Sequence, residues 1–224
     1  MLIQMTADEI AVANDQLTMA LPQEALRWAV ERFHPRLLMA TAFGAEGCCI
    51  IHMLADIDPS VKVINIDTGY QFPETLELRE RILRRYGIAV EYVRPELSVP
   101  EYEEEHGGPL YELRSDQCCH DRKILPLRKA MARLDPLCWI SAIRKDQTQD
   151  RGKADVVQWD AKFKVVKVNP LLNWGKKDVW SFIMKNDVPY NPLHDQDYPS
   201  IGCWPCTRAV QAGEDDRAGR WAGK

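Results

Sequence analysis

Two pairs of cysteines, far apart in the chain, carry the strongest chemical signal in the sequence. Cys118 and Cys119 are adjacent, and Cys203 and Cys206 frame the segment Cys-Trp-Pro-Cys. Four thiolates brought together form a soft, anionic ligand set suited to zinc or to an iron–sulfur cluster. Adjacent cysteines are awkward ligands for one tetrahedral ion, whereas a cubane cluster offers each thiolate its own iron. The pattern therefore favours a [4Fe–4S] cluster.

The other three cysteines lie in apolar segments, and we expect Cys48, Cys49 and Cys138 to pack in the core. Seven cysteines is an odd number, and the spacing within the pairs is too short for ordinary structural disulfides. This usage is typical of a reducing compartment, so we expect the protein to be cytoplasmic.

Composition limits the classes of protein that the chain can represent. Its 224 residues are 46% hydrophobic, which suffices for one large α/β domain or two small ones. The formal charge of −4 argues against a general nucleic-acid binder. No apolar run approaches the roughly 20 residues of a membrane helix, and the first residues lack the layout of a signal peptide.

Strand and helix signals alternate along the chain. Short apolar runs predict strands at 37–40, 61–66, 89–93 and 137–143, followed by a hairpin or edge pair at 156–159 and 163–168. Helices are predicted at 45–55 and from Pro73 to a stop at Gly87. This order predicts an α/β fold with a doubly wound, mainly parallel sheet flanked by helices.

Small and polar residues follow the first two predicted strands. Exposed amides between a strand and a helix bind phosphate or sulfate, and the helix dipole adds attraction for the anion. Because parallel strands end at one edge of the sheet, the two loops predict a ligand crevice there. The candidate binding residues are Thr41, Ala42, Phe43, Gly44 and Glu46 in the first loop, and Asp67, Thr68 and Gly69 in the second.

Five segments in sequence order make a more specific pattern. Ala-Thr-Ala-Phe-Gly-Ala-Glu at 40–46, Ile-Asp-Thr-Gly-Tyr-Gln-Phe-Pro-Glu-Thr at 66–75 and Ile-Arg-Lys-Asp-Gln-Thr at 143–148 resemble the assimilatory sulfonucleotide reductases. Those enzymes reduce adenylyl sulfate (APS) or its 3′-phosphorylated form (PAPS). Cys-Cys-His-Asp-Arg-Lys at 118–123 and Gly-Cys-Trp-Pro-Cys-Thr-Arg at 202–208 resemble the cluster motifs of the iron–sulfur branch, which mostly uses APS. The resemblance implies an adenine nucleotide alpha hydrolase-like fold and a [4Fe–4S] cofactor.

The resemblance also implies roles for five cations. Lys123 follows the cysteine pair, where the family keeps a lysine beside both cluster and substrate. Arg144 and Arg151 flank a turn after the fourth strand and are expected to clamp phosphate or sulfate in fork geometry. Arg217 and Arg220 match the C-terminal arginines that meet the substrate in the family.

In these reductases a cysteine on a mobile tail attacks the sulfonate sulfur and releases AMP, and thioredoxin then frees sulfite from the resulting thiosulfonate. The tail motif lies beyond a Gly-Arg-Trp segment, found here at 219–221. No cysteine follows Cys206 in this sequence. We therefore expect residues 1–206 to form one nucleotide-binding reductase domain and residues 207–224 to begin a tail that stops before the nucleophile.

Several alternatives stay open at this point. The substrate can be APS or PAPS, with thioredoxin or a similar dithiol as the reductant. The Cys-Trp-Pro-Cys pair has the form of a thioredoxin-like redox site, although that fold places the pair early in a smaller domain. Four cysteines can also staple a zinc-binding interaction module, and the first loop resembles the ATP-pyrophosphatases, where no cluster is expected. Neither a nucleic acid nor a membrane is an expected partner, and a homo-oligomer is possible.

Overall fold

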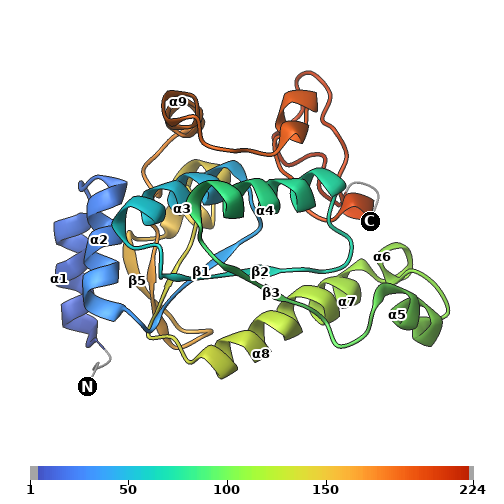
Figure 1. Cartoon of the computed structure of the whole chain (residues 1–224), viewed down its shortest axis with the longest axis horizontal. Coiled ribbons are helices and arrows are strands. Elements are labelled where there is room, and N and C mark those ends of the chain that lie inside the picture. The colour runs from blue at the N-terminus through green and yellow to red at the C-terminus, as the bar shows by residue number, and fades with distance from the viewer. Residues whose placement is uncertain (1–4, 222–224) are drawn as a thin grey trace.

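Six strands form one sheet in the order β3-β2-β1-β4-β6-β5. The computed structural model describes residues 5–221 (Figure 1). All neighbouring strands pair in parallel except β5, which is antiparallel to β6. This arrangement confirms the predicted doubly wound α/β fold, with the predicted hairpin at one edge. The strands are β1 (Leu37–Thr41), β2 (Lys62–Ile66), β3 (Val90–Val93), β4 (Cys138–Ile140), β5 (Val157–Asp160) and β6 (Val165–Val168).

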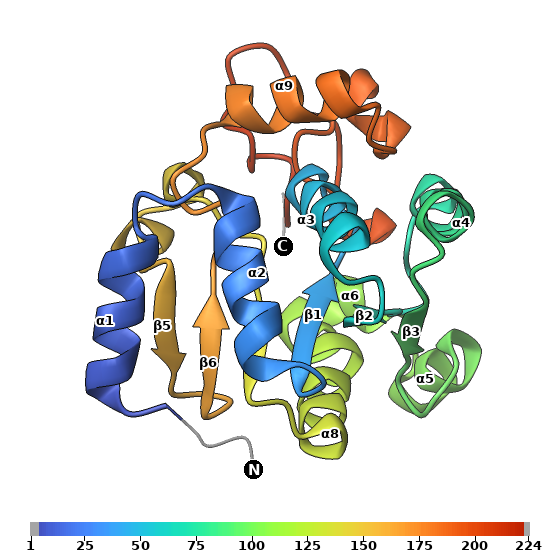
Figure 2. The ribbon, with the colours of Figure 1, turned by 60° about the vertical axis from the view of Figure 1, so that its left-hand side comes forward.

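Helices cover both faces of the sheet (Figures 1 and 2). The predicted helix from Pro73 is present as α4 and ends where Gly87 adopts the left-handed conformation, with φ 65°. A glycine is favoured there because it lacks the Cβ that makes this conformation costly. The helices are α1 (Ala7–Leu17), α2 (Pro22–Phe33), α3 (Ala45–Ile57), α4 (Pro73–Tyr86), α5 (Val99–His106), α6 (Leu110–Leu113), α7 (Ser115–Cys119), α8 (Leu125–Leu134) and α9 (Lys176–Asn186).

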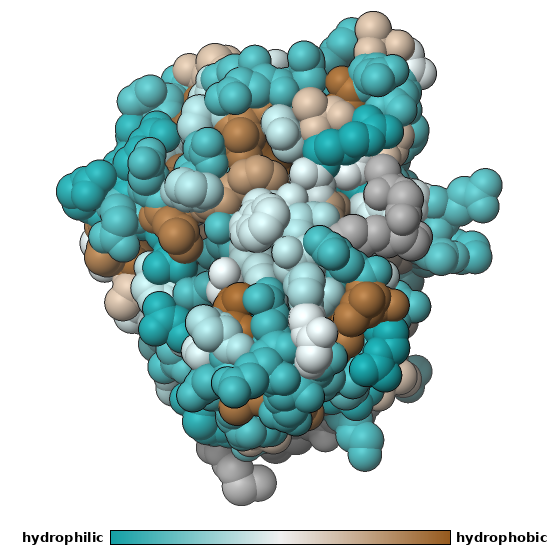
Figure 3. Space-filling view, turned by 90° about the vertical axis from the view of Figure 1, so that its right-hand side faces the viewer, coloured by the Kyte–Doolittle hydropathy of each residue, from teal (hydrophilic) through white to brown (hydrophobic). Residues whose placement is uncertain are grey.

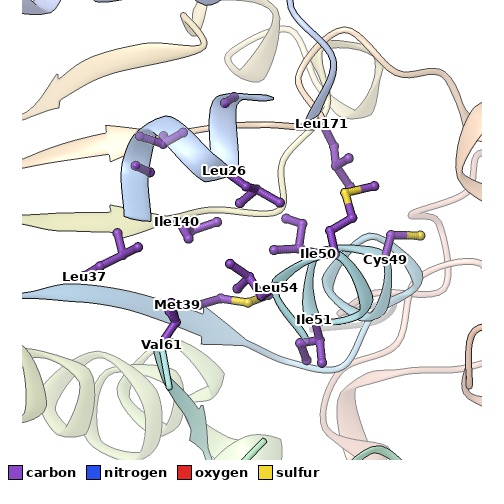
Figure 4. Packing of buried hydrophobic residues seen from close by; sticks show 14 of the residues in the cluster. Leu26, Leu37, Met39, Cys49, Ile50, Ile51, Leu54, Val61, Ile140 and Leu171 are labelled. Atoms are coloured by element: carbon purple, nitrogen blue, oxygen red, sulfur yellow. The ribbon is translucent and has the colours of Figure 1, made fainter. Parts of the chain in front are cut away.

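Alternating side chains of β1 divide the core between the two faces of the sheet. Leu37 and Met39 belong to the larger apolar cluster, which includes residues of α2 and α3 (Figure 4). Leu38 belongs to a smaller cluster with Ala130 and Met131 of α8. A strand buried on both faces reads as a continuous apolar run, because successive side chains point to opposite sides. Cys48, Cys49 and Cys138 lie in the larger cluster, as expected.

The two cysteine pairs come from different structural settings. Cys118 and Cys119 end α7, which continues through a π-helical turn (His120–Ile124) into α8. Cys203 and Cys206 bracket a short 3₁₀ turn (Trp204–Cys206) near the C-terminus. Other 3₁₀ turns span Lys145–Gln147, Arg151–Lys153 and Pro192–Gln196. No helix within residues 5–221 is long and apolar enough to cross a membrane.

The segment after α9 folds back over the ends of the strands. An isolated antiparallel bridge pairs Gln71 with Cys203, and a second pairs Thr207 with Arg220. The Trp221 amide donates to the Cys206 carbonyl over 3.0 Å. Residues 207–221, expected to begin a tail, therefore pack against the second cysteine pair.

Candidate active site

Both cysteine pairs line one small pocket. Its lining consists of Cys118, Cys119, Cys203 and Cys206 together with Thr68, Tyr70, Tyr111, Arg122, Lys123 and Pro205. The Trp204 amide donates to the Tyr70 carbonyl over 2.9 Å, which ties the second pair to the loop after β2. The Thr68 hydroxyl lies 3.3 Å from the Cys203 sulfur. The surface at this end of the molecule is mainly hydrophilic, with small separate apolar groups (Figure 3).

The pocket disfavours the thiolate form of Cys118. Burial, together with the neighbouring thiolates Cys119, Cys203 and Cys206, raises the pKa of Cys118 to about 11. A bound cationic centre reverses this effect, because metals bind the deprotonated thiolate. Among the described residues, no three Cys, His, Asp or Glu side chains are grouped closely enough to hold a single metal ion. Four thiols in one pocket supply the soft, anionic ligand set that suits zinc or an iron–sulfur cluster.

A second cavity, of about 370 Å³, opens at the carboxyl ends of the strands. Predicted residues that line it are Thr41, Ala42, Gly44, Glu46, Arg144, Arg151, Arg217 and Arg220. The close approach of α3 to β1 requires a glycine at 47, because a Cβ there would lie 2.7 Å from the Thr41 Oγ1 atom. This packing places the first loop in the cleft.

Three arginines of the cleft have no carboxylate partner among the residues that the structure describes. Arg151, Arg217 and Arg220 form no ion pair there, although all three are partly buried. Burial and the nearby charge of Arg217 lower the pKa of both Arg151 and Arg220. Cations gathered against their mutual repulsion are typical of a site for a multiply charged anion.

Arg144 differs from the other three arginines. Its side chain is 8% exposed and forms ion pairs with Glu46 at 2.8 Å and with Asp146 at 2.6 Å. Glu46 also accepts a hydrogen bond from Gln147 over 2.9 Å. Arg144 and Glu46 therefore line the predicted cleft, but they bind each other and hold the turn after β4 in place.

Five predicted residues do not line the cleft. Phe43 is 1% exposed and lies in the core with φ 56°. Asp67 pairs with Arg79 at 3.4 Å and with Arg94 at 3.2 Å. The other three are placed on the cysteine side of the site: Thr68 and Lys123 line the cysteine pocket, and Gly69 lies between Val99 and Arg122. The loop after β2 is therefore part of the cysteine pocket, whereas the sequence suggested a wall of the ligand crevice.

The structure adds residues that the sequence did not single out. Gln147, Lys176, His194 and Ser200 line the cleft. His194 Nδ1 lies 2.8 Å from the Tyr198 carbonyl, and because a carbonyl only accepts, this nitrogen carries the proton. Its buried Nε2 has no partner among the described residues, and burial lowers the pKa of the imidazole. No local pattern predicts His194, because this residue lines the cleft only when residues 192–196 and the first loop come together in the fold.

Comparison with known proteins agrees with this geometry. Residues 36–209 match the phosphoadenosine phosphosulfate reductase domain family. The chain is 40% identical over 218 residues to the adenosine 5′-phosphosulfate reductase of Salinibacter ruber, covering 97% of this chain and 86% of that protein. It is also 40% identical to the phosphoadenosine 5′-phosphosulfate reductase of Gloeobacter violaceus, covering 97% and 94%.

A solved structure gives the same result. The phosphoadenylyl-sulfate reductase of Candida auris, in a phosphate complex, superposes with a TM-score of 0.83 at 33% identity. The match covers 93% of this chain and 99% of that one. The chain therefore belongs to the phosphoadenosine phosphosulfate reductase family.

Proposed function

We propose that this chain is an APS reductase of assimilatory sulfate reduction, which yields sulfite and AMP with thioredoxin as the reductant. The observation that carries the proposal is a cleft with three unpaired guanidiniums beside a pocket with four thiols. Arg220 connects the two sites. It lines the cleft, and its guanidinium lies against Gly202, the residue before Cys203.

The three arginines suit the charges of a sulfonucleotide. APS carries a phosphate joined to a sulfate, and negative charge builds up on the phosphate as the bond between them breaks. Guanidiniums fixed before the reaction stabilise that charge without reorganising. Arg151, Arg217 and Arg220 are the candidates for this role, and the amides of the first loop add donors near the start of α3.

The cysteine pocket is the proposed site of the cofactor. Cys118, Cys119, Cys203 and Cys206 would hold a [4Fe–4S] cluster, with Lys123 in the pocket wall as an electrostatic contact toward the substrate. When bound, the cluster supplies a compact charged centre that ties α7 to the C-terminal segment.

The chemical step needs a thiolate that can reach the sulfonate sulfur. That thiolate forms an S–S bond as the S–O bond breaks, and AMP leaves with the electron pair. A dithiol then attacks the thiosulfonate and releases sulfite, so that the dithiol is oxidised to a disulfide. Burial raises the pKa of Cys48 to about 12 and that of Cys138 well above its usual range, so neither is a good nucleophile. We therefore assign the attack to neither of them.

PAPS is the second candidate substrate, because the two relatives of equal identity are named for different nucleotides. An additional 3′-phosphate needs an available cation. Arg151, Arg217 and Arg220 are assigned above to the phosphosulfate group. The other Lys and Arg side chains that line the described cleft are already paired: Arg144 with Glu46 and Asp146, and Lys176 with both carboxylate oxygens of Asp216, at 2.8 and 2.9 Å. These pairings favour APS.

Calorimetric titration of the 224-residue protein with AMP, APS and PAPS tests the proposal. We expect APS to bind more tightly than PAPS, and AMP to compete with it. Arg217→Gln removes an unpaired guanidinium and should weaken APS binding about 10–100-fold, as expected for one charged hydrogen bond. Arg208→Gln is the matched control, because Arg208 is exposed and already bonded to Glu214. Tighter binding of PAPS, or equal loss in both variants, would overturn the assignment.

A further inference from the structure

The buried arginine beside the first cysteine pair has no ionic partner. Arg122 is 3% exposed, and it forms no ion pair with any carboxylate of residues 5–221. Its Nε donates to the Thr68 carbonyl over 2.7 Å and its Nη1 to the Leu97 carbonyl over 3.2 Å. Two neutral carbonyls satisfy hydrogen bonds but leave the charge uncompensated. A buried, uncompensated cation is costly, so this position calls for an anion.

Aromatic rings close off two sides of the guanidinium. Its carbon lies 5.3 Å from the centroid of the Tyr70 ring and 5.0 Å from that of Tyr102. The hydroxyls of these tyrosines donate to Glu103 and Asp121, each over 2.9 Å. Neither of these carboxylates forms an ion pair with Arg122, and the ring faces add only the weak attraction of a cation–π contact.

The cysteine pocket lies beside this guanidinium. Arg122 lines that pocket with all four thiols, and it follows Cys118 by four residues through the π-helical turn. Four thiolates with a [4Fe–4S] core carry net negative charge, which a fixed cation in a dry site stabilises strongly. The hydrogen bonds to Thr68 and Leu97 prevent the guanidinium from turning to solvent.

We propose that Arg122 is a positioning residue that offsets the negative charge of the cluster held by Cys118, Cys119, Cys203 and Cys206. This inference rests on the proposed function, since it presupposes the cluster. In this role Arg122 helps the centre to retain its iron and makes the reduction potential of the centre less negative. Lys123 keeps its separate role toward the substrate.

The first test removes the charge from Arg122. Arg122→Gln, reconstituted anaerobically with iron and sulfide, should lose iron to a chelator about 10–100-fold faster than the unaltered protein, as for other residues that support metal ligands. The cluster that remains should have a more negative reduction potential, because adding an electron beside fewer positive charges is less favourable. Arg122→Lys should restore most of the potential. Arg128→Gln removes an exposed charge nearby and should change neither quantity.

A second pair of variants leaves Arg122 in place. A Cβ placed on Gly69 would lie 2.6 Å from the Val99 Cγ2 atom and 3.1 Å from the Arg122 Nη2 atom. The side chains of Val99 and Arg122 therefore approach the same point, and a longer side chain at 99 can reach the guanidinium. Val99→Glu supplies a carboxylate that neutralises Arg122, and Val99→Gln is its uncharged match. We expect faster iron loss and a more negative potential in the Glu variant alone.

The outcomes separate the inference from the proposed function. If the unaltered protein takes up no iron and sulfide, the cluster itself is refuted. If it takes them up but Val99→Glu matches Val99→Gln, the role of Arg122 is refuted while the cluster stands. The role also fails if Arg122→Gln and Arg122→Lys show the same potential, since the arginine would then act only as a structural brace.

Discussion

The guanidinium of Arg220 lies directly over the backbone of Gly202. A Cβ at position 202 would come within 2.3 Å of the Arg220 Nη2 atom and 2.5 Å of its Cζ atom. Arg220 Nη1 also donates to the Ser200 hydroxyl over 3.2 Å. The absence of a side chain at 202 therefore lets one arginine serve the cleft while touching the segment that carries the second cysteine pair.

Gly202→Ala should displace Arg220 without removing its charge. We expect APS and AMP to bind about tenfold more weakly, because a displaced guanidinium loses one charged hydrogen bond to the ligand. Gly152→Ala is the control, since a Cβ at 152 meets its nearest neighbour at an ordinary 3.7 Å. Unchanged binding in Gly202→Ala would show that Arg220 does not hold the anion.

The Arg144–Glu46 pair predicts a loss of stability. Glu46→Ala leaves the buried Arg144 with Asp146 alone, and it removes the acceptor for Gln147. We expect the free energy of unfolding to fall by about 1–3 kcal/mol, measured by urea denaturation. Glu96→Ala breaks an exposed pair with Lys129 and should cost much less, because solvent screens that pair. Equal losses would argue against a structural role for Glu46.

Each of the four pocket cysteines should be needed for the cluster. Cys118→Ser should abolish the broad visible absorbance and reduce iron to background, and it should destabilise the fold because the cluster links segments roughly 80 residues apart. Cys48→Ser is the control, since that thiol lies in the core 3.7 Å from the Phe43 carbonyl, where a hydroxyl can donate. Full iron content in Cys118→Ser would contradict the ligand assignment.

Stability should fall as the solution is acidified below neutrality. Burial lowers the pKa of His52 and His194 in the native state, whereas unfolding returns them to about 6.5. Below that pH the unfolded chain binds more protons, so the free energy of unfolding decreases as the pH falls. Urea denaturation between pH 7.5 and 5.5 measures this slope.

His194→Asn keeps a donor for the Tyr198 carbonyl but removes the titrating group, so the slope should become shallower. An unchanged slope in His194→Asn would show that His194 does not contribute.

The 224-residue polypeptide should bind APS but release no sulfite above background when thioredoxin is present. Its cysteines are four proposed ligands and three core residues, and a covalent route that has no available nucleophile is abolished instead of being slowed modestly. A longer polypeptide with a Glu-Cys-Gly-type tail should turn over. Sulfite production at a normal rate by residues 1–224 would make Cys48, Cys49 or Cys138 the nucleophile.

Much of the fold and the chemistry followed from local patterns. Apolar runs and a stop at Gly87 predicted the strands and α4, because periodicity and backbone preference act within a few residues. The spacing of Cys118-Cys119 and of Cys203 and Cys206 predicted two thiol pairs. The family resemblance then singled out Arg151, Arg217 and Arg220 as anion-binding candidates, and the structure places all three in one cleft.

Only the tertiary structure determined the partner of each charged residue. Arg144 resembled the other arginines in sequence, yet it pairs with the carboxylate of Glu46, which lies 98 positions away in the chain. Asp67 followed a strand as a ligand-binding residue would, but Arg79 and Arg94 pair with it. The energy of a charge depends on its burial and on its neighbours in space, and neither is encoded in the spacing of residues along the chain. For the same reason, the buried charge of Arg122 beside the four thiols became apparent only when the π-helical turn, the loop after β2 and the C-terminal segment were assembled.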